Sequence, residues 1–481
     1  MAQSSIKKNF FYQMIYQVLI IILPFITSPY IARVIGADGL GTYSYSYSIA
    51  YYFVLFSMLG IANYGNRAIA QCRDEQEKMD IVFSNITALH IIFSCICCLI
   101  YIIYIVFFAS EKLYAWIQLF YVLSGLFDIS WFYFGIEKFK LTVTRNVTIK
   151  IINVICVFTF VRNSNDLWKY CVIMALGMLI SQIALWFPLK KYVHFCKPNW
   201  NNMKSHIPPL FILFIPAIAV SLYKYMDKIM IGALSSKAEL GLYENAEKVV
   251  NIPLTIITSF GTVMLPKMSN LVSSKNRKET SRYIALSMRY VMCLAFALAF
   301  GLAGVGKVFA PVFWGAEFKK SGILIMGLSF TIPFMSFANV IRTQYLIPTE
   351  KDREYLSSVV CGAIINLIIN RMLIPTMGSI GAMIGTIAAE VLVCIIQSWA
   401  VRKELPLSEY IINFRIFIVF AIIMFGGVFF IGEGLRTSIV TLFVQIVVGG
   451  LIYGILSIFY FYFTNDQIIG KMFQKIQKNR G

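Results

Sequence analysis

Apolar stretches long enough to cross a lipid bilayer follow one another along almost the whole chain. A spanning α-helix needs roughly 20 mostly apolar residues, and short polar stretches separate the segments that meet this requirement. With 59% hydrophobic and 14% charged residues, the chain has more apolar surface than a soluble core can bury. We therefore predict an all-α integral membrane protein of about fourteen helices, at residues 10–33, 42–63, 82–108, 113–135, 146–162, 168–189, 207–232, 240–266, 283–310, 321–345, 355–376, 379–401, 412–432 and 437–463.

The net charge of +19 is gathered in short loops between these segments. A nucleic-acid partner is not expected, because a phosphate backbone needs a continuous basic surface. Basic loops alternate with loops poor in cations, as the positive-inside rule predicts for the two sides of a membrane. Both termini are then expected in the cytoplasm. The basic loops contain Arg73 and Lys78; Lys138, Lys140 and Arg145; the clusters 190–204 and 267–282; Lys351 and Arg353; Arg402 and Lys403; and the tail residues Lys471, Lys475, Lys478 and Arg480.

Two motifs occur twice in the chain, in the same order. The pattern IGA followed by LG-x-Y lies at 35–43 and again at 231–243, and an II-N-x-I pattern lies at 151–155 and 364–368. The copies fall in corresponding spans, so the chain contains an internal repeat. Six helices per copy is an even number, which gives the copies parallel topology. The predicted domains are six-helix bundles at 1–205 and 206–405, and two additional helices with a basic tail at 406–481.

Ionisable residues inside the spans are candidates for function, because each costs about 2.5–3.5 kcal/mol at a helix centre. Lys224 and Lys228 share one helix face, with Asp227 beside them, and the next span carries Glu244 and Lys248. Cations outnumber carboxylates in the spans, which favours an anionic ligand. The alternative is that these groups form structural ion pairs that hold the two spans together. Further intramembrane charges are Arg33, Asp128, Lys150, Arg289, Arg342, Arg371 and Glu390.

A run of tyrosines lies early in the second span. Their rings could line a sugar-binding cavity, since aromatic faces stack on pyranose rings. An interfacial aromatic belt is the alternative interpretation. The residues are Tyr43, Tyr45, Tyr47, Tyr51 and Tyr52.

Motifs for catalysis or ATP hydrolysis are missing from the sequence. The segment 301–307 nearly matches a phosphate-binding loop, but Val308 replaces the required Ser or Thr and the segment lies inside an apolar helix. Zinc-binding spacings and nucleophile motifs are absent, and the cysteines lie mostly in apolar runs. We therefore predict no catalytic residue, no metal site and no enzymatic activity.

Three stretches resemble the Wzx-type polysaccharide flippases, in the PST branch of the MATE/MOP superfamily. They are SPYIARVIGADGLGTYSYSYSIAYYFVLFSMLGIANYGNRAIA (28–70), YKYMDKIMIGALSSKAELGLYENAEKVVNIPLTIITSFGTVMLPKMS (223–269) and QYLIPTEKDREYLSSVVCGAIINLIINRMLIP (344–375). Together with the helix count, the resemblance covers nearly the whole chain. It implies a MATE-like fold of two six-helix bundles around a central cavity, plus two C-terminal helices.

The resemblance also implies a function and a site. The chain would move undecaprenyl-pyrophosphate-linked oligosaccharides to the outer leaflet of a bacterial cytoplasmic membrane by alternating access, for capsule, exopolysaccharide or O-antigen synthesis. Polysaccharide polymerase and glycosyltransferases are the expected partners, with no cofactor and H⁺ or Na⁺ as candidate coupling ions. A cationic cavity would use Arg33, Arg67, Lys224, Lys228, Lys248 and, less directly, Arg342, with Asp227 and Glu244 as candidate ion-coupling groups.

Two other functions stay open at this point. One is a MATE-like exporter of drugs or metabolites driven by an ion gradient, although organic cations would want an acidic interior. The other is a membrane enzyme such as a polymerase or acyltransferase, a class that usually needs a sizeable outer loop or an acid/base cluster.

Overall fold

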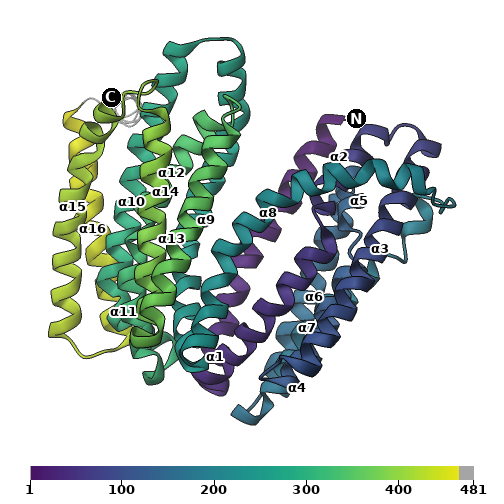
Figure 1. Ribbon diagram of the computed structural model, residues 1–481. Helices are drawn as coiled ribbons and strands as arrows, with labels where there is room; N and C mark the ends of the chain where they lie inside the picture. Colours follow the sequence, from purple (N-terminus) through teal and green to yellow (C-terminus); the bar gives the residue numbers. More distant parts are fainter. Residues whose placement is uncertain (1, 465–481) are drawn as a thin grey trace. The chain divides into compact units, whose positions relative to one another are not determined.

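All regular structure in the computed structural model, which describes residues 2–464, is helical (Figure 1). Side chains are described from Leu23 onward, except at positions 216 and 223. The α-helices are α1 (Ala2–Met58), α2 (Ile61–Cys72), α3 (Gln76–Phe107), α4 (Lys112–Leu126), α5 (Ser130–Gly135), α6 (Phe139–Phe160), α7 (Leu167–Ala184), α8 (Trp200–Leu234), α9 (Lys237–Ser273), α10 (Arg277–Trp314), α11 (Lys319–Ser329), α12 (Thr331–Ile341), α13 (Asp352–Met377), α14 (Ser379–Val401), α15 (Leu407–Gly434) and α16 (Ile439–Phe463).

Thirteen helical segments of the described chain are long and apolar enough to cross a membrane. The number differs from fourteen because the first two predicted spans form one long helix, α1, which is interrupted only at Gly36. Gly36 has φ 77° and ψ 177°, a conformation that residues with a Cβ atom rarely adopt. Counting the segments on either side of this break separately gives the fourteen predicted spans. The predicted basic tail lies outside the described residues.

Two predicted spans are made of more than one helix. The span at 113–135 consists of α4 and α5, and the intramembrane residue Asp128 lies in the break between them. The Asp128 carboxylate accepts a hydrogen bond from the backbone N–H of Ser130 at 2.9 Å, so this charge satisfies a backbone group that the break leaves unpaired. The span at 321–345 consists of α11, α12 and a π-helical turn, Arg342–Leu346.

The chain divides into two compact units, residues 1–241 and 242–481. This division places α8 with the N-terminal unit, where it packs on α1, α2 and α3. It differs from the predicted domain boundary at 205/206, which followed the repeated motifs; that repeat-based boundary stays a prediction.

The core of the N-terminal unit lies where α2, α3 and α5 meet. Phe83 on α3 packs against Trp131 and Phe132 of α5, with ring centroids 5.6 and 4.8 Å apart. The extended segment 193–199 runs beside α3, and its backbone N–H groups donate to the side chains of Asp80, Ser84 and Asn85. This segment joins α7 to α8 and fixes where α8 begins.

The C-terminal unit is assembled around α10. Helices α11, α12, α15 and α16 all pack on it, while α13 and α14 form a closely packed pair. The hydroxyl of Tyr453 on α16 donates to the Cys293 carbonyl of α10 at 2.6 Å. Gln445 donates to the Val428 carbonyl at 2.8 Å, which ties α16 to α15. The two helices beyond the repeat are therefore an integral part of this unit.

The repeated motifs make equivalent contacts in the two units. Tyr43 of the first copy packs edge-on against Tyr170 of α7, with centroids 4.8 Å apart. Tyr243 of the second copy bonds through its hydroxyl to Thr386 of α14 at 2.9 Å. In both cases the motif tyrosine contacts the last helix of its repeat, which supports the internal repeat inferred from the sequence.

The two glycines of the repeated LG-x-Y motif lie against each other inside the N-terminal unit. A Cβ atom on Gly41 would lie 1.6 Å from the Lys237 carbonyl oxygen and 3.0 Å from the backbone nitrogen of Gly241. A Cβ atom on Gly241 would lie 2.0 Å from the Ala37 carbonyl oxygen. Only glycine allows α1 and the first turn of α9 to approach this closely.

We expect Gly41→Ala and Gly241→Ala each to destabilise the protein by about 1–3 kcal/mol, because the added methyl group must displace backbone atoms. Thermal unfolding of the detergent-purified chain measures the effect. Gly450→Ala on α16 is the matched control, since nothing lies within 4 Å of its Cβ position. Equal melting temperatures for Gly41→Ala and Gly450→Ala would refute the close approach.

Candidate functional site

The two lysines predicted to share a face of α8 both lie close to one aromatic ring. Asn199 caps the start of α8 by accepting from the backbone N–H of Asn201 at 2.9 Å, and the helix then continues to Leu234. The Nζ atoms of Lys224 and Lys228 are 5.7 and 5.4 Å from the ring centroid of Tyr225. Both distances permit a cation–π attraction.

These charged groups differ in their exposure. Lys224 is exposed, whereas Lys228 and Asp227 are 9% and 5% exposed. Buried charges require polar partners, and both buried residues are engaged with other groups of the protein. Lys224 is therefore the more accessible of the two cations.

A ladder of tyrosines on α1 faces these lysines. Tyr43, Tyr47 and Tyr51 are spaced by four residues and so occupy one helix face. Tyr51 stacks on Tyr225 with centroids 3.9 Å apart. Tyr47 packs against Tyr121 of α4 at 4.8 Å, and their hydroxyls are 3.3 Å apart. These rings pack against other helices of the unit, which argues against the interfacial-belt interpretation for Tyr47 and Tyr51.

The rings and cations together make a surface of mixed chemistry, which we call the tyrosine–lysine surface. Its aromatic faces suit the apolar C–H groups of sugars, and its ammonium groups suit phosphate oxygens. All of its members lie in the N-terminal unit, on α1, α4 and α8. The residues are Tyr47, Tyr51, Tyr121, Lys224, Tyr225 and Lys228.

The other two tyrosines of the predicted run have different roles. Tyr52 donates a hydrogen bond to the Ser221 carbonyl of α8 at 3.1 Å. The Tyr45 ring lies 3.1 Å from the Nζ atom of Lys237, which also donates to the Gly232 carbonyl at 2.7 Å. Tyr45 and Tyr52 thus attach α1 to α8.

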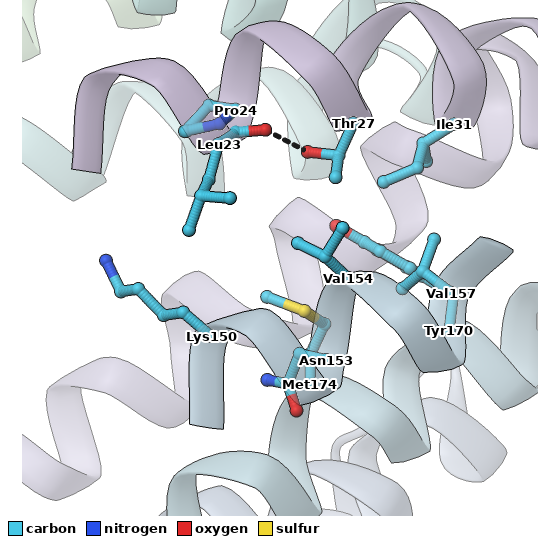
Figure 2. A pocket seen from close by; sticks show the side chains of 10 residues that line it. All are labelled: Leu23, Pro24, Thr27, Ile31, Lys150, Asn153, Val154, Val157, Tyr170 and Met174. Carbon is cyan, nitrogen blue, oxygen red and sulfur yellow. Dashed lines mark hydrogen bonds between the residues drawn. The ribbon is translucent and has the colours of Figure 1, made fainter. Parts of the chain in front are cut away.

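A small cavity in the same unit contains another intramembrane cation, Lys150. Its volume is about 160 Å³, and it lies between α1, α6 and α7 (Figure 2). Lys150 is half-buried and reaches one side of the cavity, while Leu23, Ile31 and Val157 make most of the rest apolar. The cavity is too small for an oligosaccharide, so Lys150 is not part of the tyrosine–lysine surface.

Other predicted site residues of the N-terminal unit lie elsewhere. Arg33 is exposed, three residues before the break at Gly36, and interacts with a neighbouring group. Arg67 is exposed on α2 and lies 5.9 Å from the ring of Tyr64. Arg67 thus contacts a ring outside the tyrosine–lysine surface.

Three predicted site residues belong to the C-terminal unit. Lys248 and Glu244 form an ion pair within α9, with Nζ and Oε1 2.8 Å apart, so this pair is structural but does not join the two spans. Arg342 begins the π-helical turn and lies 5.5 Å from the ring of Tyr355.

The near-match to a phosphate-binding loop is part of the long helix α10. Lys307, its last residue, pairs with Glu433 of α15 at 2.7 Å. This lysine therefore joins two membrane helices and does not bind nucleotide. Among the described residues no group of three or more His, Cys, Asp or Glu side chains could hold a metal ion.

Sequence reasoning missed three residues that complete the contacts of the tyrosines. Tyr121, Tyr170 and Lys237 come from α4, α7 and the start of α9. Tyr121 and Tyr170 lie in apolar segments, and Lys237 lies in a short stretch between two predicted spans. No spacing in the sequence links them to α1, because helix packing alone brings them there.

The chain thus belongs to a class of multi-pass membrane proteins with two repeat-related helical units. It is a member of the polysaccharide biosynthesis protein family, whose family model matches residues 6–272, more than half of the chain. A second family model, Lipid II flippase MurJ, matches residues 143–472. The resemblance to polysaccharide flippases predicted from the sequence is confirmed.

Curated relatives and solved structures agree with this assignment. A putative O-antigen transporter of Shigella dysenteriae is 22% identical over 79% of this chain and 96% of its own length. The capsular polysaccharide biosynthesis protein CapF of Staphylococcus aureus is 23% identical over 83% of this chain and 99% of its own length. The fold resembles Lipid II flippase MurJ in an inward closed conformation, with TM-score 0.71, 16% identity, and 93% and 98% of the chains covered. An inward-facing multidrug resistance MATE family transporter matches with TM-score 0.61 and 12% identity. The match covers 76% of this chain and 92% of the transporter.

The matched families and relatives are transporters and flippases rather than enzymes. This agrees with the lack of catalytic motifs in the sequence. The MATE-like all-α membrane fold predicted from the sequence is also confirmed.

We expect Tyr51→Ala to lower the melting temperature of the purified protein, because it removes a stacked ring pair that contributes about 1 kcal/mol beyond the buried area. Tyr51→Phe is the matched control and should unfold like the wild type, since it keeps the ring. If the two variants unfold at the same temperature, the Tyr51–Tyr225 stack does not contribute to stability.

Proposed function

We propose that this protein is a flippase that moves undecaprenyl-pyrophosphate-linked oligosaccharide repeat units from the cytoplasmic to the outer leaflet of a bacterial cytoplasmic membrane. The product would be used for capsule, exopolysaccharide or O-antigen synthesis. The observation that carries the proposal is the tyrosine–lysine surface inside a membrane protein of the polysaccharide biosynthesis family. The names of its relatives, which include an O-antigen transporter and a capsule protein, support it.

The pyrophosphate accounts for the cations. It carries at least two negative charges next to a lipid tail, and moving it through a membrane requires compensating charge where the dielectric constant is low. Lys224 is the exposed cation of the surface and would contact the pyrophosphate. Lys228 would add positive potential from its buried position.

The oligosaccharide accounts for the tyrosines. Sugar rings present C–H faces that pack on aromatic rings, and hydroxyl groups that bond to phenol oxygens. Tyr47, Tyr51 and Tyr225 supply such rings next to the lysines. Aromatic packing tolerates many sugars, so it suits a carrier that must pass a whole repeat unit.

The mechanism that we propose is alternating access. The head group enters from the cytoplasm, while the lipid tail extends through a lateral gap and stays in the bilayer. The two units then open outward. Both termini would lie in the cytoplasm. A polysaccharide polymerase and glycosyltransferases would act on the same lipid-linked repeat unit.

A cation exporter of the MATE type is a weaker alternative. Its organic-cation substrates would need an acidic surface, but Lys224 and Lys228 make this surface basic. Ion coupling by H⁺ or Na⁺ stays compatible with a flippase. Asp227, buried beside Lys228, and Glu244, paired with Lys248, are the candidate groups for it.

We expect Lys224→Ala to reduce polymer export at least tenfold while the protein remains in the membrane, because the pyrophosphate loses its accessible counter-charge. Surface polymer in a strain that depends on this gene is the readout. Lys224→Arg should keep most activity. Lys112→Ala, at the exposed start of α4, is the matched control and should export normally. Normal export by Lys224→Ala would remove Lys224 from the site.

A reporter fused after Gly481 should give a cytoplasmic signal, because fourteen spans return the chain to the side on which it began. A reporter inserted at Arg436, between α15 and α16, should give an external signal. A cytoplasmic signal at both positions, or an external signal at the C-terminus, would contradict the topology.

A further inference from the structure

Three loops of the C-terminal unit enclose a cavity of about 610 Å³, which we call the basic cavity. The loops are the α9–α10 connection, the segment after the π-helical turn and the α14–α15 connection. All three are among the loops predicted to be basic. The cavity falls in the size range of small-molecule sites, about 300–1,000 Å³.

The charges on its walls are mostly positive. Lys275, Arg277 and Lys403 line it, with Glu404 as the carboxylate among the lining residues. None of the three cations forms an ion pair with any described residue. A cavity with several unpaired cations is built to receive an anion.

The one carboxylate is already neutralised. Lys351 and the hydroxyl of Tyr345 both bond to Glu404. The Lys351 ammonium, together with this hydroxyl, holds the pKa of Glu404 below its usual range. Glu404 therefore stays ionised and bound to Lys351. The charge of Arg277 also lowers the pKa of Glu404, but Arg277 forms no ion pair with it.

The backbone adds positive potential at the same place. Lys275 adopts φ 56°, and this turn leads into the 38-residue helix α10, whose first residue is Arg277. The N-terminus of a long helix attracts anions. Glu279 occupies the first turn, where its backbone N–H donates to Asn276 at 3.2 Å, and it partly offsets this potential.

We propose that the basic cavity binds a phosphate-bearing ligand of the diphosphate class. The arginine guanidinium can hold two phosphate oxygens at once, and the two lysines act as point charges on the others. Ser281 and Thr349 also line the cavity, with their hydroxyls bonded to Tyr410 and to the Tyr345 carbonyl. The diphosphate group is common to soluble nucleotide-type ligands and to lipid-linked carriers, while an anionic phospholipid offers a single phosphate.

This site goes beyond the proposed function. It lies on residues of the C-terminal unit, none of which belongs to the tyrosine–lysine surface, and binding to it does not require transport. A ligand here would bridge the three loops and so hold α9, α10, the π-helical turn and α15 together at one end of the unit.

Inorganic pyrophosphate is the first probe, titrated into the detergent-purified full chain by calorimetry. We expect saturable binding by the wild type and at least a tenfold weaker affinity for the double variant Arg277→Ala/Lys403→Ala. Lys319→Ala/Arg371→Ala removes the same two charge types outside the cavity and is the matched control. If the double variant does not fold, the single variant Lys403→Gln, in an exposed loop, takes its place.

The lipid source is tested in nanodiscs. Pyrophosphate affinity is compared between discs of phosphatidylcholine alone and discs that contain phosphatidylglycerol. An unchanged affinity supports a diphosphate ligand. A weaker affinity with phosphatidylglycerol, which the double variant does not show, means that single lipid phosphates compete for the cavity and overturns the assignment to the diphosphate class. The proposal is overturned if neither probe distinguishes the double variant from the wild type.

A last comparison separates this site from the proposed transport site. In Lys224→Ala the pyrophosphate binding that the double variant loses should persist, while any additional binding at the tyrosine–lysine surface should be lost. Loss of pyrophosphate binding in Lys224→Ala, with normal binding in the double variant, would place the anion at the tyrosine–lysine surface and overturn the assignment to the basic cavity.

Discussion

The contact between Gly41 and Gly241 sets the geometry on which much of the N-terminal unit depends. The backbones of α1 and α9 approach so closely at these two glycines that a Cβ atom on either residue would overlap a carbonyl oxygen. Because α1 is held against the first turn of α9 there, Tyr45 reaches Gly232 and Lys237. Further along α1, Tyr47 and Tyr51 reach α4 and α8. A backbone contact that only glycine permits therefore lies on α1 close in sequence to the tyrosines of the tyrosine–lysine surface.

Lipid as a solvent explains why the remaining polar groups are where they are. A backbone break or a charge within the membrane needs a partner from the protein. Asp128 satisfies the break between α4 and α5, and Lys248 is paired with Glu244. Lys228 and Asp227 are buried and engaged. Lys224 differs from these because it is exposed on a surface rich in aromatic rings. This difference is the physical basis for choosing it as the residue that meets the substrate.

The two candidate sites use positive charge in different settings. The tyrosine–lysine surface combines cations with aromatic rings, which suits an anionic group attached to sugars. The basic cavity combines cations with hydroxyl side chains in loops, which suits a phosphate without a requirement for sugar stacking. A family that handles lipid-linked polysaccharides meets phosphate both on its substrate and on the surrounding lipids. Sites of both kinds are therefore chemically reasonable in one chain.

The sequence by itself determined the membrane class, the positions of the spans and the repeat, because hydropathy and loop charge act locally and apolar length is set by bilayer thickness. It also indicated Lys224 and Lys228 through their spacing on one helix. It did not determine that the first two spans form one helix with a break at Gly36, or that Lys248 is paired. The partners Tyr121 and Tyr170, and the meeting of three loops around the basic cavity, were decided by tertiary structure alone, because helix packing joins residues that no sequence spacing relates.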